Sequence, residues 1–311
     1  MKNFSYEFEK YTGRNSRHIC PGCQHPHTLT RYINRFTGEE VSPEVGICDR
    51  VNKCGYHFTP KEYYQLNNLP LPVLAAPAEF NPVIIKPPSF IPQRFLESSK
   101  QAFARNNFVI FLNRTLGEQK SKQVVESYQI GTSKYWPGAT IFWQIGQDGK
   151  VHTGKVMLYD KESGKRIPKH VNWVHTFIND PQFRVQQCLF GEHLLKSNPQ
   201  MPVAVVESEK SAIIASTYFP QFVWLACGGI TQLNAGKCKV LQGRKIILIP
   251  DTDGYMNWTE VALKLKKELN QTFFVSDLLE NMARTSEREA GWDIADYLIA
   301  GRFNELVGMK N

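Results

Sequence analysis

The chain has 311 residues, of which 42% are hydrophobic and 21% are charged, as in globular proteins with buried cores. No apolar run approaches the roughly 20 residues of a membrane helix, and the N-terminus leads into charged residues rather than an apolar signal segment, so we expect a cytoplasmic protein with no membrane partner. The formal net charge of +8 suits a polyanionic partner. Much of the excess lies between Ile91 and Leu195, where 14 Lys and Arg face 8 Asp and Glu.

Four of the seven cysteines fall in the first 54 residues, and an odd total argues against a disulfide framework. Cys20 and Cys23 flank two residues, a spacing that lets both thiolates face one ion, and Cys48 and Cys54 form a wider second pair. Four thiolates are a common ligand set for structural zinc. His57 is an alternative ligand, because it follows Cys54 at the same two-residue spacing. A closed site of this kind stabilises a fold and leaves no position open for catalysis.

The cysteine block, residues 1–65, is expected to form a zinc-binding ribbon of short strands and turns. Its basic and aromatic residues Arg31, Tyr32, Arg35 and Phe36 could present a face to nucleic acid, or could simply lie in a solvated loop. Residues 66–93 then carry prolines at positions 70, 72, 77, 82, 87, 88 and 92. This density excludes a regular helix or sheet interior and predicts an extended linker.

The middle block, residues 94–198, begins with a helical pattern and continues with strand-like runs at Thr140–Ile145 and Lys155–Tyr159. Turn residues separate these runs at 146–149 and 162–165. We therefore expect a basic α+β subdomain with an antiparallel sheet.

The last block, residues 199–311, alternates short apolar runs with helical patterns and ends in a helical tail. Such alternation predicts an α/β domain whose parallel sheet is covered by helices. The expected strands are Val203–Val206, Phe222–Ala226, Lys245–Ile249 and Thr272–Val275, and the expected helices are Lys210–Tyr218 and Thr259–Asn270.

Three carboxylates follow strands of this predicted parallel sheet. Glu207 comes directly after the first strand, and Asp251 and Asp253 follow the third. The carboxyl ends of parallel strands share one edge, where ligands bind, so we expect the three side chains to meet there and to hold Mg²⁺ or Mn²⁺. The alternative is an acidic surface turn beside an ordinary strand-end glutamate.

The two acidic segments carry a resemblance to a known family. Val205-Val206-Glu207-Ser208-Glu209-Lys210-Ser211-Ala212 and Ile249-Pro250-Asp251-Thr252-Asp253-Gly254 resemble the toprim domain shared by bacterial primases, topoisomerases and some nucleases. The usual glycine after the glutamate is Ser208 in this chain. Gly291-Trp292-Asp293-Ile294-Ala295-Asp296-Tyr297-Leu298 resembles an acidic motif that follows toprim in primase-like proteins.

The resemblance extends to the other blocks in the same order. The cysteine block is similar in position to the zinc ribbon of bacterial primases. The segments 148–155, 169–172 and 189–192 resemble the basic half of the primase core, with Lys169-His170-Val171-Asn172 matching a segment near template and nucleotide. The whole is most like the short primase-like proteins of mobile genetic elements, although the chain ends soon after the toprim segment.

The resemblance implies a DNA primase-like nucleotidyltransferase that acts on single-stranded DNA with NTPs, with a replication helicase as a candidate partner. A toprim nuclease and a zinc-dependent DNA-binding module without catalysis are the alternatives. Glu207, Asp251 and Asp253 would be catalytic and would hold the divalent ion. The residues implied to contact nucleic acid or nucleotide are Lys155, Lys165, Arg166, Lys169, Asn172 and Lys210.

Overall fold

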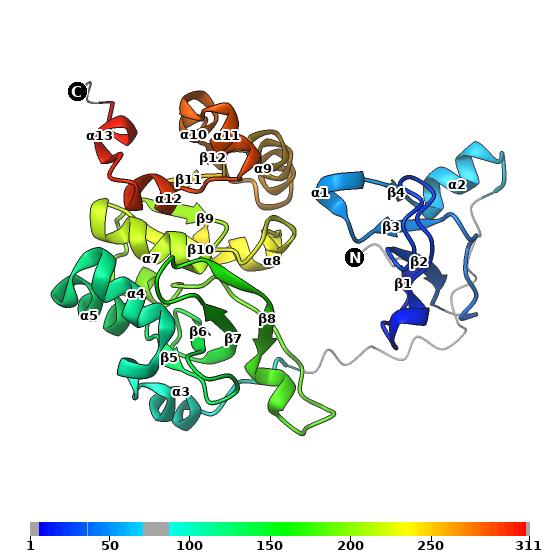
Figure 1. Ribbon diagram of the computed structural model, residues 1–311. Coiled ribbons are helices and arrows are strands. Elements are labelled where there is room, and N and C mark those ends of the chain that lie inside the picture. The colour runs from blue at the N-terminus through cyan, green and yellow to red at the C-terminus, as the bar shows by residue number, and fades with distance from the viewer. Residues whose placement is uncertain (1–5, 36, 71–86, 309–311) are drawn as a thin grey trace. The chain divides into compact units, whose positions relative to one another are not determined.

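The computed structural model describes residues 6–35, 37–70 and 87–308, which contacts divide into two compact units with a boundary after residue 85 (Figure 1). Residues 71–86, the greater part of the predicted linker 66–93, lie outside the described residues. The end of that stretch belongs to the second unit, because the Ile91 amide donates to the Val151 carbonyl at 2.7 Å.

The first unit is a small antiparallel sheet with strands in chain order. Its buried apolar cluster consists of Cys20, Leu29 and Cys48, which is too small a core to hold a fold without another source of stability. Thr59 caps the last helix through a reciprocal capping box with Glu62. The elements are β1 (Tyr6–Phe8), β2 (Leu29–Asn34), β3 (Gly46–Cys48), α1 (Val51–Cys54), β4 (His57–Phe58) and α2 (Pro60–Leu66).

The second unit begins with helices and a four-stranded sheet in the order β5-β6-β7-β8, in which every pairing is antiparallel, as predicted. The strand Thr140–Ile145 has the expected bounds. The following strand begins at Val151 rather than at the expected Lys155, because the hairpin at 146–149 pairs Val151 with Ile145. The elements are α3 (Gln93–Ser99), α4 (Asn107–Leu116), α5 (Glu118–Ser127), β5 (Gly131–Thr132), β6 (Thr140–Ile145), β7 (Val151–Tyr159) and β8 (Arg166–Trp173).

The remainder of the second unit is built on a parallel sheet in the order β10-β9-β11-β12, which confirms the α/β fold class. Its strands are β9 (Val203–Val206), β10 (Val223–Ala226), β11 (Ile246–Leu248) and β12 (Phe274–Val275). Its helices are α6 (Leu194–Ser197), α7 (Glu209–Tyr218), α8 (Ala235–Cys238), α9 (Tyr255–Leu269), α10 (Leu278–Met282), α11 (Thr285–Glu289), α12 (Ile294–Ile299) and α13 (Phe303–Leu306).

The central strand β9 is buried on both faces, which explains its unbroken apolar sequence. Successive side chains of a strand point to opposite faces. Ala204 and Val206 belong to the apolar cluster that contains α7 and α12. Val203 and Val205 belong to the cluster that contains α9 and the end of α8. Helices therefore cover both faces of the parallel sheet.

One apolar core spans both sheets of the second unit. Phe142 and Met157 of the antiparallel sheet share a cluster with Val206 and Trp224 of the parallel sheet. Tyr128, which is 2% exposed, lies in the same cluster and donates its hydroxyl to the Trp224 carbonyl at 3.0 Å. This contact ties the chain after α5 to the edge strand β10. None of the helices in the described ranges is both long and apolar enough to span a bilayer.

Tyr128→Phe should therefore lower the free energy of unfolding of the second unit by roughly 1–3 kcal/mol, because the buried Trp224 carbonyl loses its donor. Thermal denaturation should show a drop in Tm of several degrees. Tyr135→Phe is the control, since Tyr135 is 50% exposed and its change should leave Tm unaltered. Equal Tm values for both variants would contradict a stabilising role for the Tyr128 hydroxyl.

Candidate functional site

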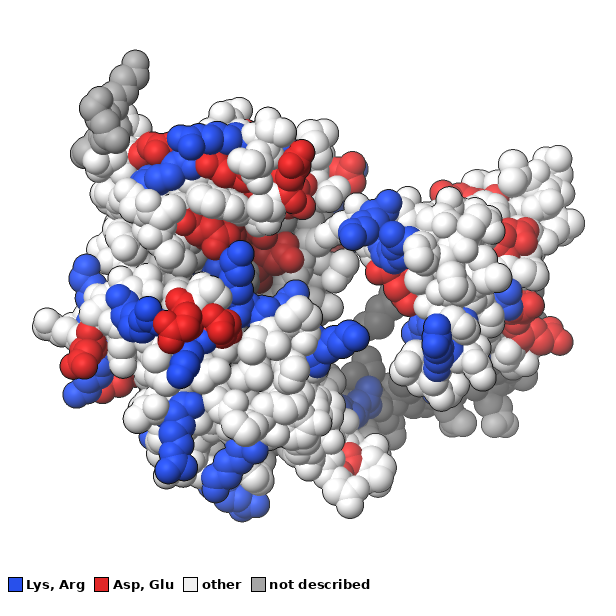
Figure 2. Space-filling view, viewed as in Figure 1, with Lys and Arg blue, Asp and Glu red and all other residues white. Residues whose placement is uncertain are grey.

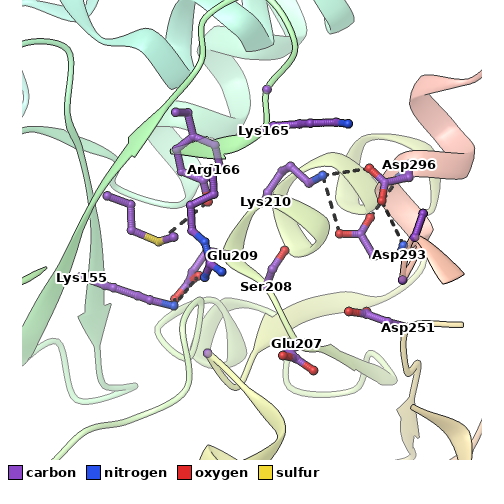
Figure 3. A pocket seen from close by; sticks show the side chains of 16 residues that line it. Lys155, Lys165, Arg166, Glu207, Ser208, Glu209, Lys210, Asp251, Asp293 and Asp296 are labelled. Carbon is purple, nitrogen blue, oxygen red and sulfur yellow. Dashed lines mark hydrogen bonds and ion pairs between the residues drawn. The ribbon is translucent and has the colours of Figure 1, made fainter. Parts of the chain in front are cut away.

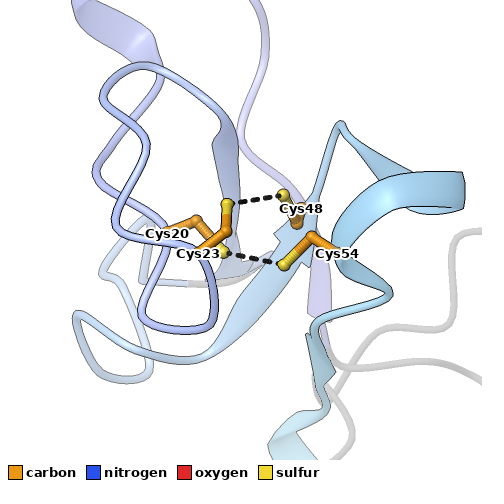
Figure 4. Close-up of side chains that lie close together, drawn as sticks. All are labelled: Cys20, Cys23, Cys48 and Cys54. Carbon is orange, nitrogen blue, oxygen red and sulfur yellow. Dashed lines mark hydrogen bonds between the residues drawn. The ribbon is translucent and has the colours of Figure 1, made fainter.

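The four N-terminal cysteines form a single cluster in the first unit (Figure 4). Their Sγ atoms all lie within 4.8 Å of one another, with Cys20 to Cys54 at 3.7 Å and Cys23 to Cys48 at 4.0 Å. A tetrahedral zinc with Zn–S bonds of about 2.3 Å requires sulfur atoms about 3.8 Å apart. The donor type, number and spacing therefore fit a structural zinc ion.

The local backbone of this cluster is shaped by tight turns. The Gln24 amide donates to the Cys20 carbonyl at 2.8 Å, which closes the first turn. A Cβ atom on Gly22 would lie 3.0 Å from Tyr56 and 3.1 Å from the Cys54 Sγ, so a side chain there would crowd the cluster. The backbone amide of His25 lowers the pKa of Cys23 to about 7, which favours the thiolate that a metal binds.

His57, the alternative zinc ligand, lies outside this set. Its side chain is exposed, and Nε2 is 2.9 Å from the Tyr32 hydroxyl. The Tyr32 ring also stacks on Phe8 at a centroid distance of 4.4 Å, which builds an aromatic face on the ribbon. Of the predicted basic residues beside it, Arg31 pairs with Glu40. Phe36 lies outside the described residues.

A pocket of about 400 Å³ opens at the carboxyl ends of strands β9 and β11 (Figure 3). Glu207 and Asp251 both line it, as the topology of a parallel sheet predicts. Asp253 is not a lining residue, but its carboxylate is close to Gly291, which does line the pocket. Figure 2 shows acidic side chains gathered on this side of the larger unit, with Lys and Arg next to them.

The acidic residues perturb one another strongly. Burial, followed by the charges of Asp293, Glu207 and Asp253, raises the pKa of Asp251 to about 9. Burial and the charge of Asp253 also raise the pKa of Glu207, against the opposing effect of Lys155 and Arg166. Both shifts have the sign expected when carboxylates crowd together without a compensating cation.

The spacing of these carboxylates limits how they could hold an ion. Within the described ranges, the cysteines alone bring three or more ligand atoms within 4.8 Å of one another. A divalent ion at the acidic pocket would therefore take few direct protein ligands in this arrangement. Mg²⁺ is commonly bound in this way, with water and phosphate oxygens completing its octahedron. The residues present fit Mg²⁺ or Mn²⁺ on those terms.

Asp293 and Asp296 line the same pocket but were absent from the predicted site residues. Asp293 begins α12 with a capping box to Asp296, and Ser211 donates its hydroxyl to Asp293 at 2.6 Å. Lys210 lies 3.0 Å from Asp296 and 3.7 Å from Asp293. Burial alone would lower the pKa of Lys210, but these two aspartates raise it. The sequence feature that could have identified Asp293 and Asp296 as pocket residues is the acidic motif at 291–298.

The residues predicted to contact nucleic acid or nucleotide divide into two groups. Lys155, Lys165, Arg166 and Lys210 line the pocket with Glu207 and Asp251. Lys155 is buried and contacts both carboxylate oxygens of Glu209 at 3.2 Å, whereas Lys165 and Arg166 are exposed. Lys169 and Asn172 do not line the pocket. The Asn172 side chain accepts hydrogen bonds from the Trp173 amide and the Thr176 hydroxyl.

Comparisons with known proteins match both units. Residues 4–69 match a family described as a putative zinc beta-ribbon finger, so the first unit is a zinc ribbon. Residues 106–252 match a domain of unknown function (DUF6371). A search of curated protein sequences finds no match.

The chain is also similar to solved primase structures. The primase fragment of the bacteriophage T7 primase-helicase protein aligns with 13% identity over 94% of this chain and 98% of its own, at a TM-score of 0.41. The RNA polymerase domain of Mycobacterium tuberculosis primase DnaG aligns with 13% identity over 70% of this chain and 80% of its own, at a TM-score of 0.43. Alignments at this level of identity do not assign residue roles to this chain.

We expect the purified protein to contain about one zinc per chain, measured by elemental analysis. Cys20→Ser or Cys54→Ser should abolish zinc binding and unfold the first unit, because metal binding contributes its folding free energy. His57→Ala is the matched control and should retain zinc, since its imidazole lies outside the cysteine set. Loss of zinc in His57→Ala, with retention in Cys48→Ser, would show that the histidine is a ligand.

The raised pKa of Asp251 predicts a pH dependence of stability. In metal-free protein, the unfolded chain releases the Asp251 proton near pH 4, whereas the folded chain retains it until about pH 9. Stability should therefore fall as pH rises between these values, by less than about 1.4 kcal/mol per pH unit. Urea denaturation at pH 5, 7 and 9 should show a shallower decline for Asp251→Asn and for wild type with Mg²⁺.

The exposed Asp277 supplies the control for this measurement. Asp277→Asn removes the same charge outside the pocket and should follow the wild-type curve. Parallel curves for wild type and Asp251→Asn would show that Asp251 titrates at its ordinary pKa.

Proposed function

We propose that this protein is a DNA primase-like nucleotidyltransferase with a metal-dependent toprim site, acting on single-stranded DNA. The observation that supports this most directly is the convergence of Glu207 and Asp251, with Asp253 nearby, at the carboxyl edge of a parallel sheet beside exposed basic residues. Concentrated negative charge next to positive charge suits a substrate whose phosphates reach the protein together with a divalent cation.

Glu207, Asp251 and Asp253 would hold Mg²⁺ or Mn²⁺, which supplies charge stabilisation at a reacting phosphate. The raised pKa values of Asp251 and Glu207 support a cation there, because a bound cation would relieve their repulsion. Asp293 and Asp296 would shape the same pocket, with Lys210 held between them.

The basic side of the pocket would receive the nucleic acid and the NTP. Lys165 and Arg166 are exposed and line the pocket, so we assign them the phosphate contacts. Lys155 is occupied by Glu209, so we assign it to orienting that carboxylate. Lys169 and Asn172 would contact the DNA strand at positions farther along β8.

The remaining parts of the proposal concern organisation and context. We divide the chain into a zinc ribbon at 1–65, a linker at 66–93, a basic primase-core-like subdomain at 94–198 and a toprim domain at 199–311. The aromatic face of Phe8 and Tyr32 on the ribbon would help to hold the DNA strand. Replication of DNA or of a mobile element, with a helicase partner, is the proposed setting.

The deciding experiment incubates the protein with single-stranded DNA, NTPs and Mg²⁺ or Mn²⁺, and separates the products on a gel. Wild type should synthesise short primers, and Asp251→Asn should lose at least ~100-fold in rate, because metal ions supply several kcal/mol of transition-state stabilisation. Asp277→Asn should retain wild-type synthesis. DNA affinity of Asp251→Asn, measured by fluorescence anisotropy, should not fall, since the exposed Lys165 and Arg166 are unchanged.

Other products would identify a different function. Shortening of the DNA by wild type, lost in Asp251→Asn, would identify a toprim nuclease instead. DNA binding without synthesis or cleavage would identify a zinc-dependent DNA-binding module. Full synthesis by Asp251→Asn would remove the acidic pocket from the proposed chemistry.

A further inference from the structure

A second polar cavity in the larger unit contains a buried lysine without a carboxylate partner. Lys237 is 7% exposed and lies on the short helix α8. Its Nζ atom contacts three neutral oxygens: Gln187 Oε1 at 3.0 Å, Gln232 Oε1 at 3.3 Å and the Cys227 carbonyl at 3.5 Å. Among residues 87–308, no Asp or Glu oxygen lies within 4 Å of this nitrogen.

Burial of this ammonium group is costly. Neutral acceptors satisfy hydrogen bonds but do not cancel the charge, and an uncompensated buried cation destabilises a fold. Burial accordingly lowers the pKa of Lys237. A bound anion would supply the missing compensation. Lys155, the other lysine that is buried in the described part of the chain, has its carboxylate partner within the protein, so the two sites differ in this respect.

The cavity around Lys237 is lined by groups that can donate hydrogen bonds. It has a volume of about 270 Å³. Gln187 and Gln232 turn their amide oxygens toward Lys237, which leaves the NH₂ group of each amide as a donor for another acceptor. No carboxylate from residues 87–308 lines this cavity. The lining residues are Gln186, Gln187, Gln232, Asn234, Gly236 and Lys237.

One peptide bond connects this cavity to the acidic pocket. The Cys227 carbonyl faces Lys237, and the next amide, that of Gly228, donates to the Glu207 carbonyl at 2.9 Å. Gly228 also lines the acidic pocket. Its φ of 83° lies in the left-handed region that favours glycine. The cavity and the pocket thus lie on either side of the same short turn.

We propose that this cavity binds a phosphate group, with Lys237 supplying the compensating positive charge and the NH₂ groups of Gln187 and Gln232 as the hydrogen-bond donors. A phosphate carries several oxygens that can accept from donors in different directions, and lysine is a frequent phosphate ligand. A carboxylate has only two oxygens and would leave more of these donors unpaired. The site requires no divalent ion and is separate from the metal-dependent chemistry proposed above.

Pyrophosphate in buffer without divalent cations is the first probe, so that the acidic pocket makes no metal-dependent contribution. Pyrophosphate should raise the Tm of wild type, because it binds the folded state. Calorimetric titration should show at least about 10-fold weaker binding for Lys237→Gln, since the variant removes the positive charge that the anion would neutralise. Lys239→Gln is the matched control, because Lys239 is two residues away and exposed, and it should bind as wild type does.

Gln187→Glu keeps the test decisive if Lys237→Gln fails to fold. This variant places a carboxylate beside the Lys237 ammonium, so it should raise Tm and abolish the response to pyrophosphate. Unchanged pyrophosphate binding in either variant would overturn the proposal. Tighter binding of acetate than of inorganic phosphate would also overturn it.

The source of the phosphate is found by competition under the same conditions. Displacement of pyrophosphate by an NTP, but not by an oligodeoxynucleotide, would assign the cavity to a nucleotide. The reverse result would assign it to the DNA backbone. Either outcome supports phosphate binding only if Lys237→Gln abolishes the competition. Because primer synthesis is not measured, a failed proposal for the acidic pocket would not alter this result.

Discussion

Burial of carboxylates beside one another at one end of a parallel sheet is the constraint on which the pocket of the larger unit depends. Parallel strands all end at the same edge, so chain topology brings Glu207 and Asp251 into one pocket. Two lysines neutralise neighbours of this pair, Lys155 at Glu209 and Lys210 at Asp296. Glu207 and Asp251 themselves have no such ion pair within residues 87–308. Their charges are therefore relieved by a bound proton, as the raised pKa of Asp251 indicates, or by the divalent cation proposed for this pocket.

The fold was predictable where the sequence pattern is local. The apolar run Val203–Val206 is the strand β9 with the expected bounds, because a strand buried on both faces must be apolar throughout. The edge strand β12 is only Phe274–Val275, shorter than the expected Thr272–Val275, because it pairs on one side with two residues of β11. The apolar sequence pattern identifies a strand, whereas pairing with the adjacent strands determines where that strand begins and ends.

The site was predictable only in part, because ion pairs depend on distant partners. Lys155 was expected to steer phosphates, and the sequence did not indicate its contact with Glu209, which is 54 residues away. Single-residue chemistry gives no indication of that partner. Lys237 was not predicted at all, since an isolated lysine in sequence carries no sign of burial. In the zinc ribbon, spacing left His57 and the cysteines as alternatives, and the structure places the His57 ring in a hydrogen bond with Tyr32 instead.

The buried pair of Lys155 and Glu209 has a consequence for sequence variation. Lys155 belongs to the antiparallel sheet and Glu209 to a helix that covers the parallel sheet, and their side chains are only 9% and 3% exposed. Loss of one charge would leave the other unpaired in a buried site, at a cost of several kcal/mol. Homologues should therefore change these two positions together, to an uncharged pair or to exchanged charges. Such covariation would show that the contact between the two sheets has been kept during evolution.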